Sequence, residues 1–201
     1  MKKIPGWAIT AVALVLSIIL AANFIKANKG AADQIRSADP DEKFVIIAKS
    51  NYKEIEASLK EYPEDLSAKE ALNSGMIVVK DQAFQKDGSK VWQKFLEKIR
   101  KKKDGAVIIC QFTTEGDPIL QYISYLDGKF YYVEDSTRDQ FSGEKYVEHT
   151  YDYFKRFEEN KLYTAFLTNE EEMTLDEAQD VRNLKTAIQI FEVKADQMKQ
   201  Q

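Results

Sequence analysis

The stretch AVIICQFTTEGDPILQYISYLDGKFYYVE, residues 106–134, carries the signals that decide the fold. Its apolar runs alternate with turn residues, which predicts strands over Ala106 to Thr113, Ile119 to Leu126 and Lys129 to Glu134. The dipeptide Asp127-Gly128 between the last two runs is typical of a type I′ hairpin turn. We therefore expect an antiparallel meander at the centre of the chain.

Three helices are predicted ahead of this meander. Ser67-Ala68-Lys69-Glu70 is a capping box that opens a short helix closed by Gly75, and the apolar run Met76 to Val79 has the length of a strand. A second helix opens at Ser89, and its apolar face is formed by Trp92, Phe95, Leu96 and Ile99. Earlier still, Lys43 to Ala48 resembles a short strand. The helical spacing of Tyr52, Ile55 and Leu59 indicates a short helix that Pro63 stops.

The segment after the meander reads as a hairpin followed by a helix. Tyr146 to Phe157 alternates in polarity and pairs naturally with Leu162 to Thr168, although a helix across 146–158 is the alternative. Thr174-Leu175-Asp176-Glu177 is a second capping box. The apolar residues behind it, at spacings of three and four, predict an amphipathic helix over 174–199: Val181, Leu184, Ile188, Phe191, Ala195 and Met198. This helix is expected to dock on the sheet, or alternatively to form an oligomer seam over Val181–Met198.

These elements predict the α+β class, with a mainly antiparallel sheet packed by two or three helices in one compact domain, residues 43–201. Residues 1–25 are expected to form a transmembrane helix ahead of this domain. Residues 26–42 are polar, contain Gly30 and Pro40, and indicate a stalk.

The amino terminus carries the membrane signal. Trp7 to Ile25 is an uncharged stretch of nineteen residues, and as a helix it would span about 28 Å, close to the hydrocarbon thickness of a bilayer. Because Lys2 and Lys3 precede it, the positive-inside tendency leaves the remaining domain outside the cytoplasm. A cleaved secretory signal and a reversed anchor are the alternatives. The first reading predicts a single-pass cell-membrane protein, and the second a secreted one.

Composition excludes several classes of function. The formal net charge is −4, and the only charges in the first 25 residues are two lysines, so the remainder is more acidic still. Such a balance disfavours general nucleic-acid binding. Cys110 is the single cysteine, which rules out an intramolecular disulfide, and its apolar run indicates a buried strand.

The sequence offers little for catalysis. His149 is the only histidine, and its place on an alternating strand is more typical of a surface or partly buried residue than of a metal ligand. Neither a Gly-x-Ser-x-Gly elbow nor a Gly-rich phosphate loop occurs. We therefore predict no catalytic residue, no bound metal and no cofactor.

One dense polar constellation remains, and it comes from two loops expected at the same end of the central hairpin. Residues 113–118 (TTEGDP) contribute Glu115 and Asp117, while residues 135–139 (DSTRD) contribute Asp135, Arg138 and Asp139. The carboxylates offer hard oxygens for Ca²⁺, or Arg138 clamps one of them. The simpler interpretation is a turn held by Gly116, Pro118 and a salt bridge. The ligand-site hypothesis names Glu115, Asp117, Asp135, Arg138 and Asp139.

The second helix is also strongly basic on its polar face, through Lys90, Lys94, Lys98, Arg100 and Lys101 to Lys103. A solvated face is the default interpretation. A weak electrostatic contact with anionic lipid or wall polymer is the alternative.

Several blocks resemble a family of unknown function. They are Ala68 to Gly75, Val78-Val79, Phe95, the Thr-x-Glu-Gly-Asp-Pro-Ile block at 113–119, Tyr125 to Gly128, and the Asp-x-Thr-Arg-Asp block at 135–139. The resemblance covers about residues 67–168. The family consists of small extracytoplasmic proteins of Gram-positive bacteria, often lipoproteins, and it implies an envelope location and an α+β fold without an activity. This chain lacks the lipid-bearing cysteine of the lipoprotein members, and a transmembrane anchor would replace it.

These observations predict a membrane-tethered, noncatalytic binding or accessory module whose partner is an unknown envelope protein or ligand. The alternative is an envelope hydrolase that uses Glu115 and Asp139 as an acid and base pair. A third possibility is a structural oligomer formed through the carboxyl-terminal helix.

Overall fold

Strands dominate the part of the chain that the structure describes, which is residues 52–143, 145–180 and 186–198 of a computed structural model. The strands are β1 (Ile77–Lys80), β2 (Ala83–Phe84), β3 (Gly105–Phe112), β4 (Pro118–Leu126), β5 (Lys129–Asp135), β6 (Tyr146–Tyr151), β7 (Tyr153–Glu159), β8 (Leu162–Thr168) and β9 (Ala187–Lys194). The helices are α2 (Tyr52–Lys60), α3 (Ala68–Asn73), α4 (Gly88–Arg100) and α5 (Leu175–Gln179), with a short 3-10 helix, η2 (Ala195–Met198). The α+β class is confirmed, with four α-helices in these residues.

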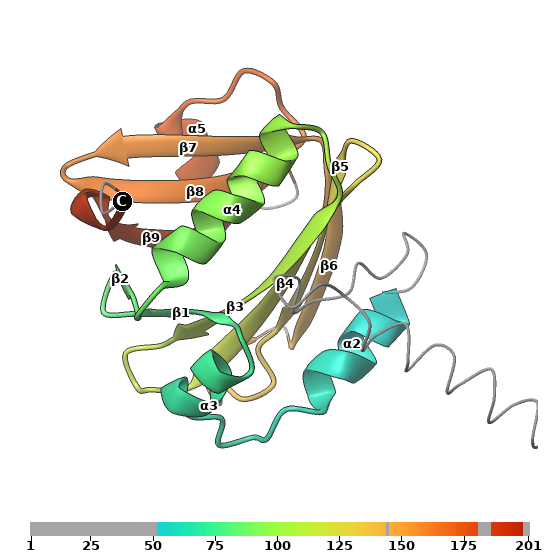
Figure 1. Cartoon of the computed structure of the whole chain (residues 1–201), viewed down its shortest axis with the longest axis vertical. Helices are drawn as coiled ribbons and strands as arrows, with labels where there is room; N and C mark the ends of the chain where they lie inside the picture. The colour runs from blue at the N-terminus through green and yellow to red at the C-terminus, as the bar shows by residue number, and fades with distance from the viewer. Residues whose placement is uncertain (1–51, 144, 181–185, 199–201) are drawn as a thin grey trace, which may run out of the picture. The chain divides into compact units, whose positions relative to one another are not determined.

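The strands divide between two sheets (Figure 1). The larger sheet has the order β2-β1-β3-β4-β5-β6, and the smaller one has the order β7-β8-β9. Every neighbouring pair is antiparallel except β1 and β3, which are parallel and are connected through α4. A mainly antiparallel architecture was expected, but its division into two sheets was not.

The central meander is confirmed. β3, β4 and β5 pair in sequence, and the β4–β5 turn places Asp127 at φ 51° and Gly128 at φ 82°. Two positive φ angles in a two-residue loop are the signature of the type I′ turn. Both capping boxes are also present, at Ser67 with Glu70 and at Thr174 with Glu177.

The main core lies between the two sheets, with α4 packed into it. Trp92 of α4 is fully buried and has its ring 5.7 Å from Phe154 of β7 and 4.9 Å from Phe191 of β9. The larger sheet contributes Ile109 and Tyr132 to the same cluster. One helix therefore supplies the aromatic contact that joins the two sheets into one core.

The opposite face of the larger sheet carries α2. The Tyr52 hydroxyl of this helix lies 2.7 Å from that of Thr150 on β6, and its ring lies 6.5 Å from the ring of Tyr131 on β5. The larger sheet is therefore buried on both faces where α2 and α4 cover it.

Two predictions about the carboxyl-terminal third need correction. The strand expected over Tyr146 to Phe157 is interrupted at Asp152, so that β6 joins the larger sheet and β7 forms the expected hairpin with β8 in the smaller one. The helix predicted over 174–199 is wrong: α5 ends at Gln179, and Ala187–Lys194 is the strand β9. Residues 181–185 lie outside the described part of the chain.

A β-bulge explains the second error. The pairing of β8 with β9 shifts between Ala165 and Phe166, which leaves Ile190 as an extra residue on β9. Both Ile190 and Phe191 are consequently buried, and the irregular apolar spacing imitates a helical one. Since Phe191 and Ala195, two residues of the predicted helical seam, are buried in the chain's own core, they are not available for it.

The predicted membrane span at residues 7–25, the stalk and the strand at 43–48 all lie outside the described residues. Within the described ranges, no helix is long and apolar enough to cross a membrane.

Candidate functional site

The structure places the two predicted polar loops at the same end of the β4–β5 hairpin, as expected. β4 begins at Pro118 and β5 ends at Asp135, which pairs with Leu120. The side chains of the two loops nevertheless hydrogen-bond to different parts of the chain. Two separate groups must therefore be considered.

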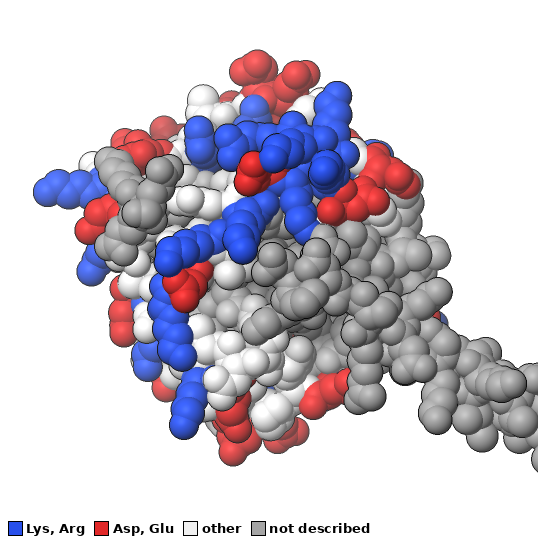
Figure 2. Space-filling view, in the orientation of Figure 1, with Lys and Arg blue, Asp and Glu red and all other residues white. Residues whose placement is uncertain are grey.

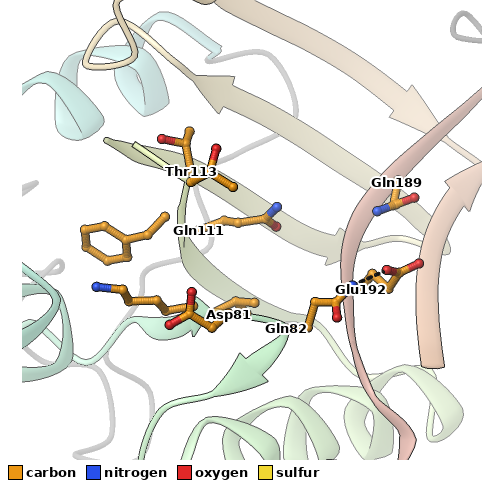
Figure 3. A pocket seen from close by; sticks show the side chains of 10 residues that line it. Asp81, Gln82, Gln111, Thr113, Gln189 and Glu192 are labelled. Carbon is orange, nitrogen blue, oxygen red and sulfur yellow. Dashed lines mark hydrogen bonds between the residues drawn. The ribbon is translucent and has the colours of Figure 1, made fainter. Parts of the chain in front are cut away.

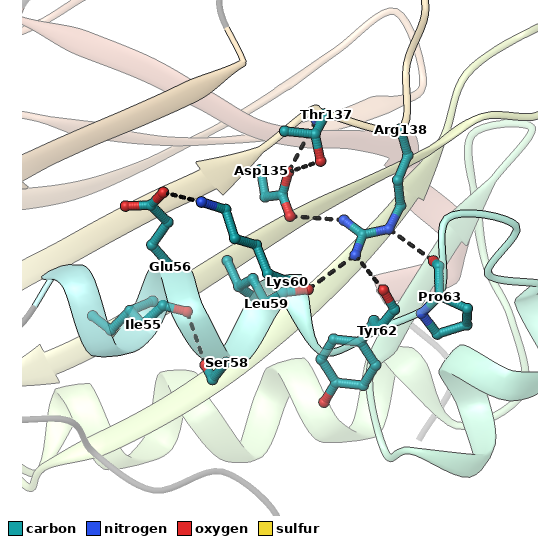
Figure 4. Close-up of polar contacts among 10 residues, drawn as sticks. All are labelled: Ile55, Glu56, Ser58, Leu59, Lys60, Tyr62, Pro63, Asp135, Thr137 and Arg138. Carbon is teal, nitrogen blue, oxygen red and sulfur yellow. Dashed lines mark hydrogen bonds and ion pairs between the residues drawn. The ribbon is translucent and has the colours of Figure 1, made fainter.

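The first group is a buried clasp made by Asp135 and Arg138 (Figure 4). Their side chains are 0% and 3% exposed, and Arg138 Nη1 lies 2.7 Å from Asp135 Oδ2. The other carboxylate oxygen accepts hydrogen bonds from the backbone N–H and the hydroxyl of Thr137, at 2.9 and 2.6 Å. The carboxylate is thus satisfied entirely by its own loop.

The guanidinium of Arg138 reaches from this clasp to the end of α2. Its Nε donates to the carbonyl oxygen of Pro63 at 2.9 Å, and Nη2 donates to those of Leu59 and Tyr62 at 2.9 and 2.7 Å (Figure 4). Unpaired carbonyl groups at a helix end need such donors. The geometry therefore gives Arg138 a structural role, which is to hold α2 on the sheet.

The second group contains the remaining candidate residues. Glu115 is exposed and accepts a 2.9 Å hydrogen bond from the Thr114 hydroxyl, which lowers the pKa of its carboxyl. Asp117 belongs to a turn in which its backbone N–H donates to Thr113 Oγ1 at 3.1 Å. Asp139 accepts from the backbone N–H of Phe141 at 2.8 Å. Over the described residues, no cluster of three or more His, Cys, Asp or Glu side chains suits a metal ion.

A pocket of about 260 Å³ lies beside the first of these loops, and we call it the notch (Figure 3). Its walls come from the end of β3 with the residues after it, from the β1–β2 turn, and from β9. The side chains labelled in the figure are Asp81, Gln82, Gln111, Thr113, Gln189 and Glu192. The notch thus gathers residues that are up to 113 positions apart in the chain, from Val79 to Glu192.

Hydrogen bonds between the β1–β2 turn and β9 close one side of the notch. Gln82 Nε2 donates to Glu192 Oε1 at 2.8 Å, and Thr164 Oγ1 donates to the other oxygen of Glu192 at 3.3 Å. The Gln82 carbonyl oxygen also accepts from the backbone N–H of Lys194 at 2.9 Å. Glu192 is therefore a structural wall of the notch, and its oxygens are already engaged.

The turn that makes this contact has an unfavourable backbone. Asp81 and Gln82 adopt φ angles of 52° and 54°, in a two-residue loop where Asn-Gly is the usual choice. A left-handed conformation costs about 1 kcal/mol at a residue with a side chain. The Gln82 contacts with β9 compensate part of that cost.

Gln111 gives the notch an unsatisfied acceptor. Its carbonyl oxygen Oε1 is buried and has no hydrogen-bond partner within the described residues. Gln121, on the same face of the neighbouring strand, is 5% exposed and has an equally unpartnered Oε1, while its Nε2 donates to Glu134 at 3.2 Å. Buried carbonyls without donors are rare in folded proteins.

Sequence reasoning missed the notch for two reasons. The Asp81-Gln82 turn lacks the glycine or asparagine that marks a type I′ loop. Gln189 and Glu192 were assigned to a helix, which left no reason to place them beside β3. One indication of the site is present in the sequence, which is that the polar residue Gln111 interrupts an otherwise apolar strand.

The remaining candidate residues agree with their expected surroundings. Cys110 is buried in β3, and burial raises the pKa of its thiol to about 12. His149 is exposed on β6, with its ring 6.0 Å from that of Tyr151. Both observations agree with the structural interpretations given to them.

Comparison with curated proteins and with solved structures found no significant match. Comparison with known families found one, described as Domain of unknown function (DUF4362). It lies inside residues 67–168, where the sequence resembles an uncharacterised family. The similarity to this family covers residues 77–164, from the start of β1 into β8.

Proposed function

We propose that this protein is a noncatalytic binding module, held at the outer face of a cell membrane by residues 7–25, and that its ligand occupies the notch. The observation that carries the proposal is the buried, unpartnered carbonyl oxygen of Gln111. Leaving such a group without a donor costs about 1–3 kcal/mol. A ligand that brings an O–H or N–H donor would remove that penalty.

The chemistry of the notch favours a neutral polar ligand. Gln111 and Gln189 carry amides that both donate and accept hydrogen bonds, and the hydroxyl of Thr113 does the same. Among the charged residues of the lining, Lys80 is balanced by Asp81, and Glu192 is already bonded to Gln82 and Thr164. The acidic residues Glu115, which is exposed, and Asp117, which is half-buried, follow the notch directly along the chain, and we include them as a flanking contact.

The geometry does not favour the acid and base pair of Glu115 and Asp139. A catalytic acid at neutral pH needs a raised pKa, whereas the hydrogen bond from Thr114 lowers the pKa of Glu115. Glu115 is also exposed to water, which holds a carboxyl in its ionised form. A binding role makes no such demand on these carboxylates.

Photocrosslinking in intact cells tests the notch. A photoreactive amino acid at Gln189, an exposed position of the notch, should form an adduct, whereas the same group at the exposed Lys129, the first residue of β5, should not. In a Gln111→Leu background, which keeps the shape but removes the carbonyl, the adduct should weaken at least tenfold. Equal adducts from both positions, or an unchanged adduct with Gln111→Leu, would argue against the notch as the binding site.

Membrane fractionation tests the tether. The intact chain should sediment with membranes at alkaline pH, and external protease should digest its domain in cells stripped of their wall. Leu16→Arg puts a charge at the middle of the apolar stretch and costs about 3 kcal/mol of insertion free energy, so it should weaken the association. Recovery of the unmodified chain in the cytosol contradicts the tether, and a shortened mass after secretion points to the cleaved signal.

A further inference from the structure

The charges of the described domain are unevenly distributed, and its most basic surface follows α4. Residues 88–103 contain seven cations, namely Lys90, Lys94, Lys98, Arg100, Lys101, Lys102 and Lys103, against the single anion Glu97. The segment carries +6 in a chain of net charge −4, so the rest of the chain carries −10. Figure 2 shows the resulting band of Lys and Arg along the line of α4. We call these residues the α4 surface.

Helical geometry keeps these cations on the outside. Trp92 and Phe95 are turned into the core, and the basic residues at positions 90, 94 and 98 repeat every four residues on another face of the helix. Three further lysines continue beyond the end of the helix at Arg100, and all three are exposed. The α4 surface is therefore a continuous charged stripe on a rigid support.

Two exposed ion pairs of the α4 surface neutralise little of its charge. Lys90 pairs with Asp87 at 2.9 Å and Lys101 with Glu97 at 2.6 Å, but all four side chains are more than half exposed. Such pairs are weak and are screened by salt. A partner with dense negative charge can compete with them.

We infer that the α4 surface docks on an anionic lipid bilayer. Six of the seven cations are lysines, which act as point charges and suit a diffuse layer of phosphates, whereas arginine suits bidentate recognition of single groups. The aromatic residues of α4, Trp92 and Phe95, are buried, so this helix has no exposed ring on which a nucleic-acid base can stack or that can anchor a protein partner.

The same asymmetry fixes the orientation of docking. The rest of the chain, with its net charge of −10, is repelled as a whole by an anionic bilayer, whereas the α4 surface is attracted to it. Each lysine that reaches the bilayer strengthens the contact by about fivefold at low ionic strength. The charge argument is independent of the proposed tether, which would add proximity to the same bilayer.

Energy transfer between the protein and the lipid provides the test. The full chain with Asp104→Cys, next to α4, is labelled with a donor dye and placed in lipid nanodiscs that carry an acceptor on the headgroups. The buried thiol of Cys110 stays unlabelled because its pKa is about 12. Transfer should rise when phosphatidylglycerol replaces a third of the phosphatidylcholine, and it should return to the lower value in 0.5 M salt.

Two double variants with the same change in charge separate the α4 surface from general electrostatics. Lys94→Glu with Lys103→Glu should weaken the contact by about 25-fold or more, because two fivefold contributions are lost. Lys53→Glu with Lys69→Glu, at exposed positions on α2 and α3, should leave it within threefold. The inference is wrong if energy transfer does not change when phosphatidylglycerol is added, or if it falls equally in both double variants.

Competition identifies the kind of partner. Polyglutamate or a DNA oligonucleotide that displaces the contact at a lower charge concentration than phosphatidylglycerol would show that the surface serves another anion, and the lipid assignment would be wrong. A chain that does not insert into the discs contradicts the proposed tether alone. In that case, phosphatidylglycerol vesicles are added to the chain that did not insert, and the two double variants are compared in the same way.

Discussion

The clasp between Asp135 and Arg138 leads to a quantitative prediction about stability. Replacing Arg138 with alanine leaves the carboxylate of Asp135, 0% exposed, without its cation. It also removes the donors of the Leu59, Tyr62 and Pro63 carbonyl oxygens at the end of α2. Since breaking one partner of a buried ion pair costs about 3–5 kcal/mol, Arg138→Ala should lower the free energy of unfolding by about 4 kcal/mol.

That loss is large for a single domain. Typical domains are stable by about 5–15 kcal/mol, and at this chain length a loss of 1 kcal/mol lowers Tm by about 2–4 °C. Arg138→Ala should therefore reduce Tm by about 8–16 °C, as measured by circular dichroism on the full chain in mild detergent. Hydrogen exchange at residues 52–63 should also accelerate, because α2 loses its attachment to the clasp.

Two comparisons make this prediction decisive. Lys90→Ala breaks the exposed pair with Asp87 and should cost less than about 1 kcal/mol. The double variant Asp135→Ala with Arg138→Ala removes both charges, so its loss should be smaller than the sum of the two single losses by more than about 1 kcal/mol. If Arg138→Ala is no more destabilising than Lys90→Ala, the clasp does not hold the fold, and a ligand-binding role for Arg138 regains support.

Three further predictions concern single features of the fold. Cys110 should react with a thiol-specific disulfide reagent at pH 8 only after urea unfolding, because burial raises its pKa to about 12; rapid labelling of the folded chain would contradict its burial. Gly128→Ala should cost about 1 kcal/mol in a urea titration, because φ is 82° and the described atoms leave room for a methyl group; an unchanged midpoint would show that the turn relaxes freely. The free energy of unfolding should fall below about pH 4.5, because the carboxyls of Glu70 and Glu177 have lowered pKa values in the folded chain and become protonated there. It should also fall above about pH 10, because burial raises the pKa of Tyr132 in the folded chain, so that this hydroxyl ionises only in the unfolded chain. Urea midpoints that stay constant from pH 3 to 11 would refute this.

Local signals explain why the centre of the fold could be predicted. The strands on either side of Asp127-Gly128 alternate clearly, and the turn needs only its own two residues. The capping boxes at Ser67 and Thr174 are equally local, because the serine or threonine and its glutamate are three residues apart. Such elements depend on neighbours in the sequence, and the sequence displays them.

The elements that were missed depend on distant partners. The division of β6 from β7 at Asp152 uses a hydrogen bond from its backbone N–H to Asn169 Oδ1, seventeen residues away. The strand β9 depends on pairing with β8 and on a bulge at Ile190, which hides the two-residue period. Neither contact leaves a periodic pattern in the sequence, so a helical interpretation was the better local fit.

The same difference separates the two parts of the candidate site. The Asp135 carboxylate and the Arg138 guanidinium were recognisable as a possible clamp because they are three residues apart, and the structure confirms the salt bridge. The notch combines the β1–β2 turn, β3 and β9, so its composition depends on the tertiary fold. The polar blocks at 113–118 and 135–139 were recognisable in the sequence, and they include the residues that stabilise one end of the domain. The notch could not be predicted from the sequence.

Two kinds of unfavourable feature meet at the notch, although both also occur elsewhere in the described domain. Two left-handed residues, Asp81 and Gln82, occur beside the unpartnered carbonyl of Gln111, whereas the buried charges of the Asp135–Arg138 clasp are fully satisfied. If the Gln111 carbonyl has no structural partner, Gln111→Leu should be neutral or should stabilise the chain by about 1 kcal/mol, since it removes an unsatisfied group. Retention of a destabilising residue is what a binding site requires, because its polar groups are completed by the ligand. A Gln111→Leu chain that is less stable than the original would show that Gln111 has a structural partner, and the reasoning that places a ligand in the notch would fail.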